Sequence, residues 1–142
     1  MPTPQPLRLL ALDPDDLDVI SAALQDAVVK VGDITYEPAA RRLTVTFNRY
    51  RWEARGGSRV RAALQLGDVQ SVQTRRIRRI PADAVLELLA LAFVPGPEAP
   101  GGTLIMTFAG GGDLRAAIEC VDAVLADISK PWPTPRAPAH KP

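Results

Sequence analysis

The residues most able to do chemistry in this sequence are arginines, and they gather in its middle third. The stretch "TRRIRRIPAD" holds four arginines within five positions, and further arginines alternate with other side chains upstream of it. A guanidinium group binds phosphate or carboxylate bidentately, so a strip of them on neighbouring strands could hold an anionic partner. The candidate ligand-binding residues are Arg49, Arg51, Arg59, Arg61, Arg75, Arg76, Arg78 and Arg79.

The charge of the chain is unevenly distributed, although its net value is only +1. Residues 1–40 carry two basic and seven acidic side chains, residues 41–79 carry eleven and two, and residues 80–142 carry four and seven. Basic strands and acidic helices could neutralise each other within one fold, or the arginines could form an anion-binding face. Because the total is near zero, we favour neutralisation within the fold.

Catalysis by a histidine-activated nucleophile is excluded by the residue counts. The single histidine, His140, lies in a proline-rich tail that cannot hold it in catalytic geometry. This removes a Ser-His-Asp triad, a Cys-His pair and a zinc site of thiolate and imidazole. The single cysteine, Cys120, is predicted to be a buried structural thiol. We therefore predict no catalytic residue, no metal and no cofactor; an enzyme with unrecognised carboxylate or arginine chemistry is the remaining alternative.

The glycine-rich stretch "GGGD" at residues 110–113 could cradle a phosphate if it opened a helix. It lacks the Lys-Ser/Thr pair of a P-loop and the spacing of a dinucleotide-binding fingerprint. We interpret it as a hairpin turn or as the entry to a helix.

One helix is predicted near the start of the chain, from about residue 14 to residue 25. Asp13 can cap it, and Pro14 suits the first helical position. The apolar residues that follow recur at helical spacing, namely Leu17, Ile20 and Leu24.

The middle of the chain alternates in the way that strands do. The first clear run places Leu43, Val45 and Phe47 on one face. The next apolar pair, Tyr50 and Trp52, is out of phase by one residue, so we predict a β-bulge at Asn48–Arg49. With Tyr50 and Trp52 in the core, Arg49 and Arg51 would face solvent. Arg59 and Arg61 would lie beside them on the next strand.

Two later segments allow both strand and helix. Residues 84–94 have helical propensity, but the proline- and glycine-rich loop at 95–102 leads into a second apolar run, so we favour a long hairpin. Residues 114–119 alternate, yet they also fit a helical pattern that continues to Ile128. A C-terminal helix is therefore expected, at least over residues 120–129.

Together these elements predict an α+β domain. It is a strongly bent antiparallel sheet of six to seven strands, of the pleckstrin-homology-like barrel type, with an N-terminal and a C-terminal helix. Residues 1–8 are expected to be a flexible N-terminus, residues 9–132 a single domain, and residues 133–142 a proline-rich tail.

Three stretches of the chain resemble a known family. They are "LQDAVVKVGDITYEP", "NRYRWE" and "APGGTLIMTFAGGGDLRAAIECVDAVLADI" followed by "PW". They are similar to the bacterial, mainly alphaproteobacterial, family named domain of unknown function 2948, over about Leu9 to Trp132. The resemblance implies a small cytoplasmic protein without assigned activity, and a strand over Leu114 to Glu119. It supplies no catalytic residue.

The function expected from the sequence is binding. We predict a soluble, cytoplasmic, non-enzymatic module that acts as a scaffold or binds a protein partner. The alternative is a module that binds an anionic ligand, such as nucleic acid, a lipid headgroup or a nucleotide, through the arginines. No apolar stretch approaches the length of about 18 residues that a membrane span requires.

Overall fold

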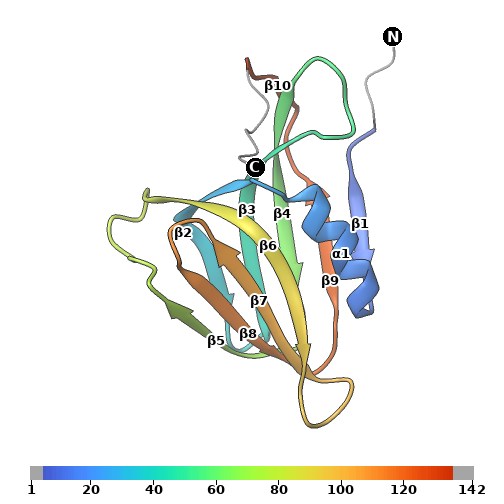
Figure 1. Ribbon diagram of the computed structural model, residues 1–142, viewed down its shortest axis with the longest axis vertical. Helices are drawn as coiled ribbons and strands as arrows, with labels where there is room; N and C mark the ends of the chain where they lie inside the picture. The colour runs from blue at the N-terminus through green and yellow to red at the C-terminus, as the bar shows by residue number, and fades with distance from the viewer. Residues whose placement is uncertain (1–4, 136–142) are drawn as a thin grey trace.

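The computed structural model describes residues 5–135, which contain one helix and ten strands (Figure 1). The helix is α1, Pro14–Ala23. The strands are β1 Arg8–Ala11, β2 Val28–Glu37, β3 Arg42–Tyr50, β4 Ser58–Leu66, β5 Val69–Arg75, β6 Val85–Pro95, β7 Gly102–Phe108, β8 Asp113–Ile118, β9 Ala123–Asp127 and β10 Trp132–Pro133. Residues 1–4 of the predicted flexible N-terminus and residues 136–142 of the predicted tail, with His140, lie outside the described part.

The strands form one antiparallel sheet that curls around a core (Figure 1). Their order is β1-β9-β4-β3-β2-β6-β7-β8-β5, and β10 pairs with β4 beside this path. The predicted antiparallel sheet is confirmed, but its ten strands exceed the predicted six to seven. The predicted barrel is wrong, because β1 and β5 end the order and the sheet does not close.

Strand β2 changes partners along its length. Its first residues, Val28 to Lys30, pair with β6, whereas Ile34 to Glu37 pair only with β3. Between these halves the register with β3 shifts by several residues, which is a large irregularity of the bulge kind. The second half of β2 therefore separates from β6. A gap opens between this half of β2 and the edge strand β5.

The helix α1 confirms the helix predicted near the start of the chain. Asp13 caps it by accepting a hydrogen bond of 2.8 Å from the backbone N–H of Asp16, and Pro14 begins it. Its inward residues are fully buried, namely Leu17, Ile20 and, as the C-cap, Leu24. They join a core that is lined from both halves of the curled sheet.

The predicted β-bulge at Asn48–Arg49 is absent. The pairing of β3 with β4 runs without a break from Leu43 opposite Leu66 to Tyr50 opposite Arg59. Since the alternation does not slip, the inward position after Phe47 is taken by Arg49. An inward-pointing arginine produced the apparent phase change in the sequence.

The predicted C-terminal helix over residues 120–129 is wrong. Those residues hold β9, which pairs with β4 on one side and β1 on the other. Its buried side chains, Ala123 and Leu125, are two residues apart, as in a strand. The favoured strand over residues 84–94 is confirmed by β6, and the strand left open for residues 114–119 is confirmed by β8.

Candidate functional site

Arg49 is a fully buried arginine, which contradicts its predicted exposure to solvent. Its Nε and Nη2 donate to the two carboxylate oxygens of Asp127 at 3.0 and 2.9 Å, and Nη1 and Nη2 donate to Glu53 at 3.0 and 2.8 Å. Burial alone would lower the pKa of Arg49, but the hydrogen bonds to Glu53 and Asp127 raise it above its ordinary value. The hydrogen bond from Arg49 lowers the pKa of Glu53. This guanidinium group is saturated and cannot receive a ligand.

Arg51 is also buried, with 6% of its surface exposed, although it too was predicted to face solvent. Its Nη1 donates to Oγ of Ser58, the first residue of β4, at 3.1 Å. Its neighbour Trp52, predicted to be core, is 38% exposed and packs edge-on against Tyr50 with a ring-centroid distance of 4.8 Å. Both arginines are thus buried rather than exposed, Trp52 is exposed rather than buried, and Tyr50 is half-buried.

Three further arginines of the predicted set are used within the fold. Arg59 donates to the backbone carbonyl of Asn48 at 3.3 Å, and Arg61 pairs with Asp33 at 3.2 Å. Arg75 pairs with Asp113 at 2.9 Å and, through its hydrogen bond, lowers the pKa of that carboxyl. These groups stabilise the sheet rather than form a continuous basic strip.

The remaining three predicted arginines, Arg76, Arg78 and Arg79, lie on the loop between β5 and β6 and are exposed. Within residues 5–135 none of the three has an ion-pair partner within 4.0 Å. We call residues 76–84 the arginine loop. It is fixed to β2, because Gly32 N–H donates to Ala82 O at 2.7 Å and Val31 N–H donates to Ala84 O at 2.9 Å.

The two isoleucines of the arginine loop behave differently. Ile77 is half-buried and packs against the core. Ile80 is 85% exposed and does not anchor the loop. Ile77 and the two backbone bonds to β2 together hold the loop beside the gap in the sheet.

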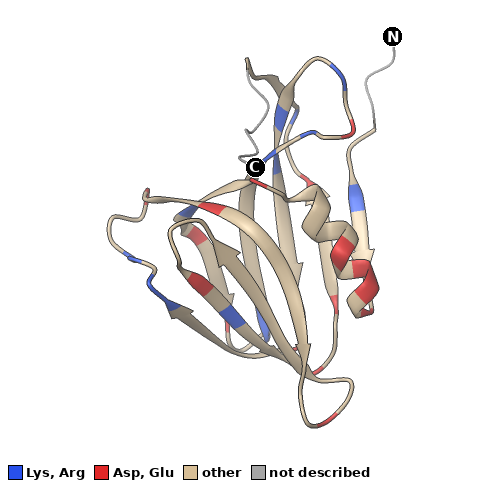
Figure 2. Cartoon of the chain, in the orientation of Figure 1, with Lys and Arg blue, Asp and Glu red and all other residues tan. Residues whose placement is uncertain are grey.

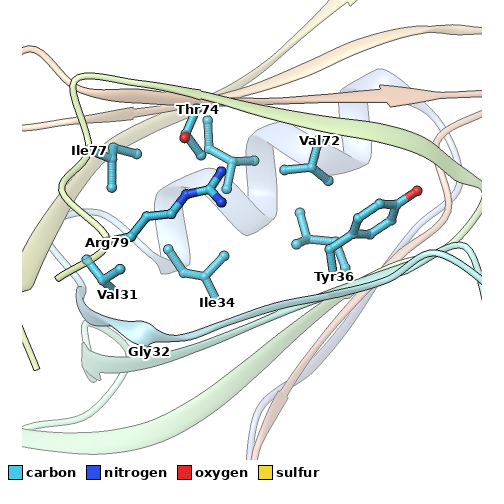
Figure 3. Close-up of a pocket in the computed structure, with 10 residues that line it drawn as sticks. Val31, Gly32, Ile34, Tyr36, Val72, Thr74, Ile77 and Arg79 are labelled. Carbon is cyan, nitrogen blue, oxygen red and sulfur yellow. The ribbon is translucent and has the colours of Figure 1, made fainter. Parts of the chain in front are cut away.

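A pocket opens at this gap, between the second half of β2 and the free edge of β5 (Figure 3). Its volume is about 420 Å³. The lining comes from β2, β3, β5, β8 and the arginine loop: Val31, Gly32, Ile34, Tyr36, Leu43, Val72, Thr74, Ile77, Arg79 and Leu114. We call it the seam pocket. Arg79 extends from the loop over it, toward Ile34 and Thr74 in this view.

One end of the seam is closed by hydrogen bonds. The hydroxyl of Tyr36 donates to Val69 O at 3.1 Å, and Val69 N–H donates to Arg41 O at 2.9 Å. The arginine loop crosses the other end. The result is a short window between two strands, bounded at both ends.

The seam pocket has the composition of a binding site. Most of its walls are aliphatic, and its polar groups are few: the hydroxyls of Thr74 and Tyr36 and the guanidinium of Arg79. Such a pocket can hold an apolar group and place one anionic group beside it. Across residues 5–135 there is no group of three or more His, Cys, Asp or Glu residues that could hold a metal ion.

Sequence reasoning found Arg79 but missed the remaining lining residues. The pocket forms where β2, β5 and the arginine loop meet, and these segments are up to about fifty positions apart in the chain. The one local signal was in "KVGDITYEP", where Gly32 and Asp33 interrupt an otherwise β-branched run.

Two other sequence features have structural roles. "GGGD" forms the turn between β7 and β8, with Gly110 and Gly111 in the left-handed region, so the hairpin interpretation is confirmed. Cys120 is partly buried after β8, and its thiol donates to Asp68 Oδ2 at 3.4 Å. Burial, followed by the hydrogen bond to Asp68, raises the pKa of this thiol. No helix among the described residues is long and apolar enough to cross a membrane.

The comparisons with known proteins place the chain in a family. Residues 7–140 match the family described as Protein of unknown function (DUF2948), and this range includes every residue of the seam pocket and the arginine loop. Neither a curated protein nor a solved structure matches the chain. The chain belongs to the DUF2948 family of proteins of unknown function.

Proposed function

We propose that this chain is a non-enzymatic binding module, and that a segment of a partner protein docks at the seam pocket. The observation that carries the proposal is the apolar window between β2 and β5, where two sheet edges part instead of pairing. A free strand edge offers backbone donors and acceptors to an incoming chain, and the pocket beside it offers room for a side chain.

The size and chemistry of the pocket support this use. A volume of about 420 Å³ accepts one or two large apolar side chains, and most of the walls are provided by Val, Ile and Leu. Val72 and Thr74 point toward the pocket from the edge strand β5 (Figure 3). A partner that paired with this edge would therefore place alternate side chains over the pocket.

The test is selection of peptides from a phage-displayed library of random nonapeptides. Thr74→Trp fills the pocket, whereas Gln73→Trp adds the same side chain to the next, exposed residue of the strand. We expect peptides that bind the wild-type chain and Gln73→Trp but lose binding to Thr74→Trp. Thermal unfolding of both variants verifies that they are folded. If no selected peptide depends on Thr74, the proposal is wrong.

A second candidate is binding of a small amphipathic anion, favoured by the position of Arg79 at the mouth of an apolar pocket. The probe is the fluorescent dye 1-anilinonaphthalene-8-sulfonate, which joins an apolar body to an anionic group. This candidate requires saturable binding of one dye per chain that Thr74→Trp abolishes. Weak binding that is unchanged in Thr74→Trp would reject it.

A further inference from the structure

We infer that the segment recognised at the seam pocket is acidic: an apolar anchor residue flanked by aspartate or glutamate. This inference rests on the proposed function, and it adds the chemistry of the partner. The partner's anchor enters the pocket, and its carboxylates meet the exposed guanidinium groups of the arginine loop.

The first step is the division of the arginines. Of the eight in the predicted set, five are bonded within the fold: Arg49, Arg61 and Arg75 to carboxylates, Arg51 to a hydroxyl and Arg59 to a backbone carbonyl. The other three, Arg76, Arg78 and Arg79, are all on the arginine loop and lack an ion pair within the described residues. Within the predicted set, the arginines that no group of the described chain binds are therefore neighbours on one loop.

The acidic residues at the start of α1 do not neutralise the arginine loop. Asp15, Asp16 and Asp18 lie on α1, and none of them forms an ion pair with an arginine of the described chain. Figure 2 shows α1, with its acidic residues, and the arginine loop on opposite sides of the view. The prediction that acidic termini compensate these arginines therefore fails for the loop, although it holds for Arg49, Arg61 and Arg75.

The second step is the position of the loop beside the pocket. Arg79 lines the pocket itself, and Ile77 of the same loop forms part of its wall. Arg76 lies against the turn between β7 and β8, in a second hollow that it shares with Arg75 and Gly111. Because the loop is bonded to β2 at Ala82 and Ala84, these arginines are held next to the seam.

The third step is the choice of ligand. Arginine binds both carboxylate and phosphate bidentately, but a nucleic-acid surface without sequence preference usually adds exposed aromatic rings for stacking. The two exposed tryptophans of the described chain, Trp52 and Trp132, are not among the lining residues, and Tyr36 uses its hydroxyl to close the seam. An apolar pocket with a basic rim is complementary to an amphipathic, acidic peptide.

The experiment repeats the peptide selection with two charge variants. The triple variant Arg76→Gln, Arg78→Gln, Arg79→Gln removes three charges from the loop. The control variant Arg8→Gln, Arg55→Gln, Lys130→Gln removes three charges from other exposed positions. Binding of the best selected peptide is then measured by fluorescence anisotropy at two salt concentrations, about 50 and 500 mM.

We expect the selected peptides to carry aspartate or glutamate on both sides of an apolar residue. The loop variant should bind them roughly tenfold more weakly, since it loses three exposed ion pairs that are each weak, whereas the control variant should stay within about twofold. High salt should reduce the affinity of the wild-type chain and change that of the loop variant much less.

Three outcomes would overturn the inference. Peptides that depend on Thr74 but have neutral flanks, and that bind the loop variant normally, would leave the proposed function standing and remove the acidic partner. Displacement of the peptide by a polyuridine oligonucleotide at a lower concentration than by the acidic peptide would identify a nucleic-acid surface instead. The absence of any peptide that depends on Thr74 would reject the proposed function and this inference together.

Discussion

Arg49 and Asp127 form a bidentate ion pair inside the sheet, across the strand that separates them. Arg49 is on β3 and Asp127 ends β9, and both strands flank β4, where their register partners are Val60 and Ala62. The distances are 3.0 Å from Nε to Oδ1 and 2.9 Å from Nη2 to Oδ2. The two side chains are 0% and 3% exposed, so the pair is a bridge beneath β4 that water does not reach.

Removing one member of this pair should destabilise the fold strongly. Arg49→Met leaves the carboxylates of Asp127 and Glu53 without their partner, and loss of half of a buried pair costs about 3–5 kcal/mol. Urea unfolding should show this loss in the free energy of unfolding. Arg42→Met, which breaks the exposed pair of Arg42 with Glu37, is the control and should cost less than about 1 kcal/mol.

A double-mutant cycle tests whether the two side chains act as a unit. The double variant Asp127→Ala, Arg49→Met should lose less free energy of unfolding than the two single variants added together, by about 1–3 kcal/mol. The reason is that the second substitution no longer leaves a buried charge without its partner. Additive losses would show that Arg49 is stabilised by Glu53 alone.

Glu87 provides a test through pH. Burial, followed by its hydrogen bond to Asp26, raises its pKa in the folded chain. A raised folded-state pKa favours the fold below the unfolded pKa, and this benefit is lost as pH rises through the folded pKa. Glu87→Gln should therefore raise the melting temperature at pH 7 more than at pH 4. Glu98→Gln, on the exposed loop after β6, is the control for the loss of one negative charge. Equal shifts of the melting temperature at both pH values for Glu87→Gln would contradict the assignment.

The sequence was sufficient for the elements whose side chains follow one simple pattern. The cap of Asp13 and the spacing of Leu17 and Ile20 predicted α1 closely, because these signals are local. The hairpin of β6 and β7 was also predicted, since a loop rich in proline and glycine joins two apolar runs.

The errors arose where a distant residue decides the local environment. The charge of Arg49 is tolerated inside the sheet because Asp127, seventy-eight positions away, pairs with it. The sequence around Arg49 gives no sign of this distant partner. The apolar residues between 120 and 129 fit both the helical and the strand period, and pairing with β1 and β4 determines that the segment is a strand. The seam pocket depends on where β2 turns away from β6, which local composition indicates only at Gly32 and Asp33.

Cys120 should react slowly with thiol reagents. Burial, followed by the hydrogen bond to Asp68, raises its pKa, so less of the reactive thiolate is present near neutral pH. Asp68→Asn keeps a residue that tolerates the positive φ of 56° but removes the negative charge. We expect the reaction rate with 5,5′-dithiobis(2-nitrobenzoate) at pH 8 to rise several-fold in this variant. Glu98→Gln is the control for net charge, and a rate that rises equally there would remove Asp68 as the cause.

Tyr36 should determine how firmly the seam is closed. Tyr36→Phe deletes the hydroxyl that donates to Val69 O at 3.1 Å and leaves that carbonyl at the start of β5 without this donor. The expected cost is about 1 kcal/mol in the free energy of unfolding, and the amides of β5 should exchange hydrogen faster than in the wild-type chain. Tyr50→Phe is the matched control, because within the described chain the Tyr50 hydroxyl makes no hydrogen bond, so its exchange pattern should not change. Unaltered exchange in β5 of Tyr36→Phe would mean that the bonds of β5 to β8 alone hold the edge strand, and that the seam is no weaker there than the rest of the sheet.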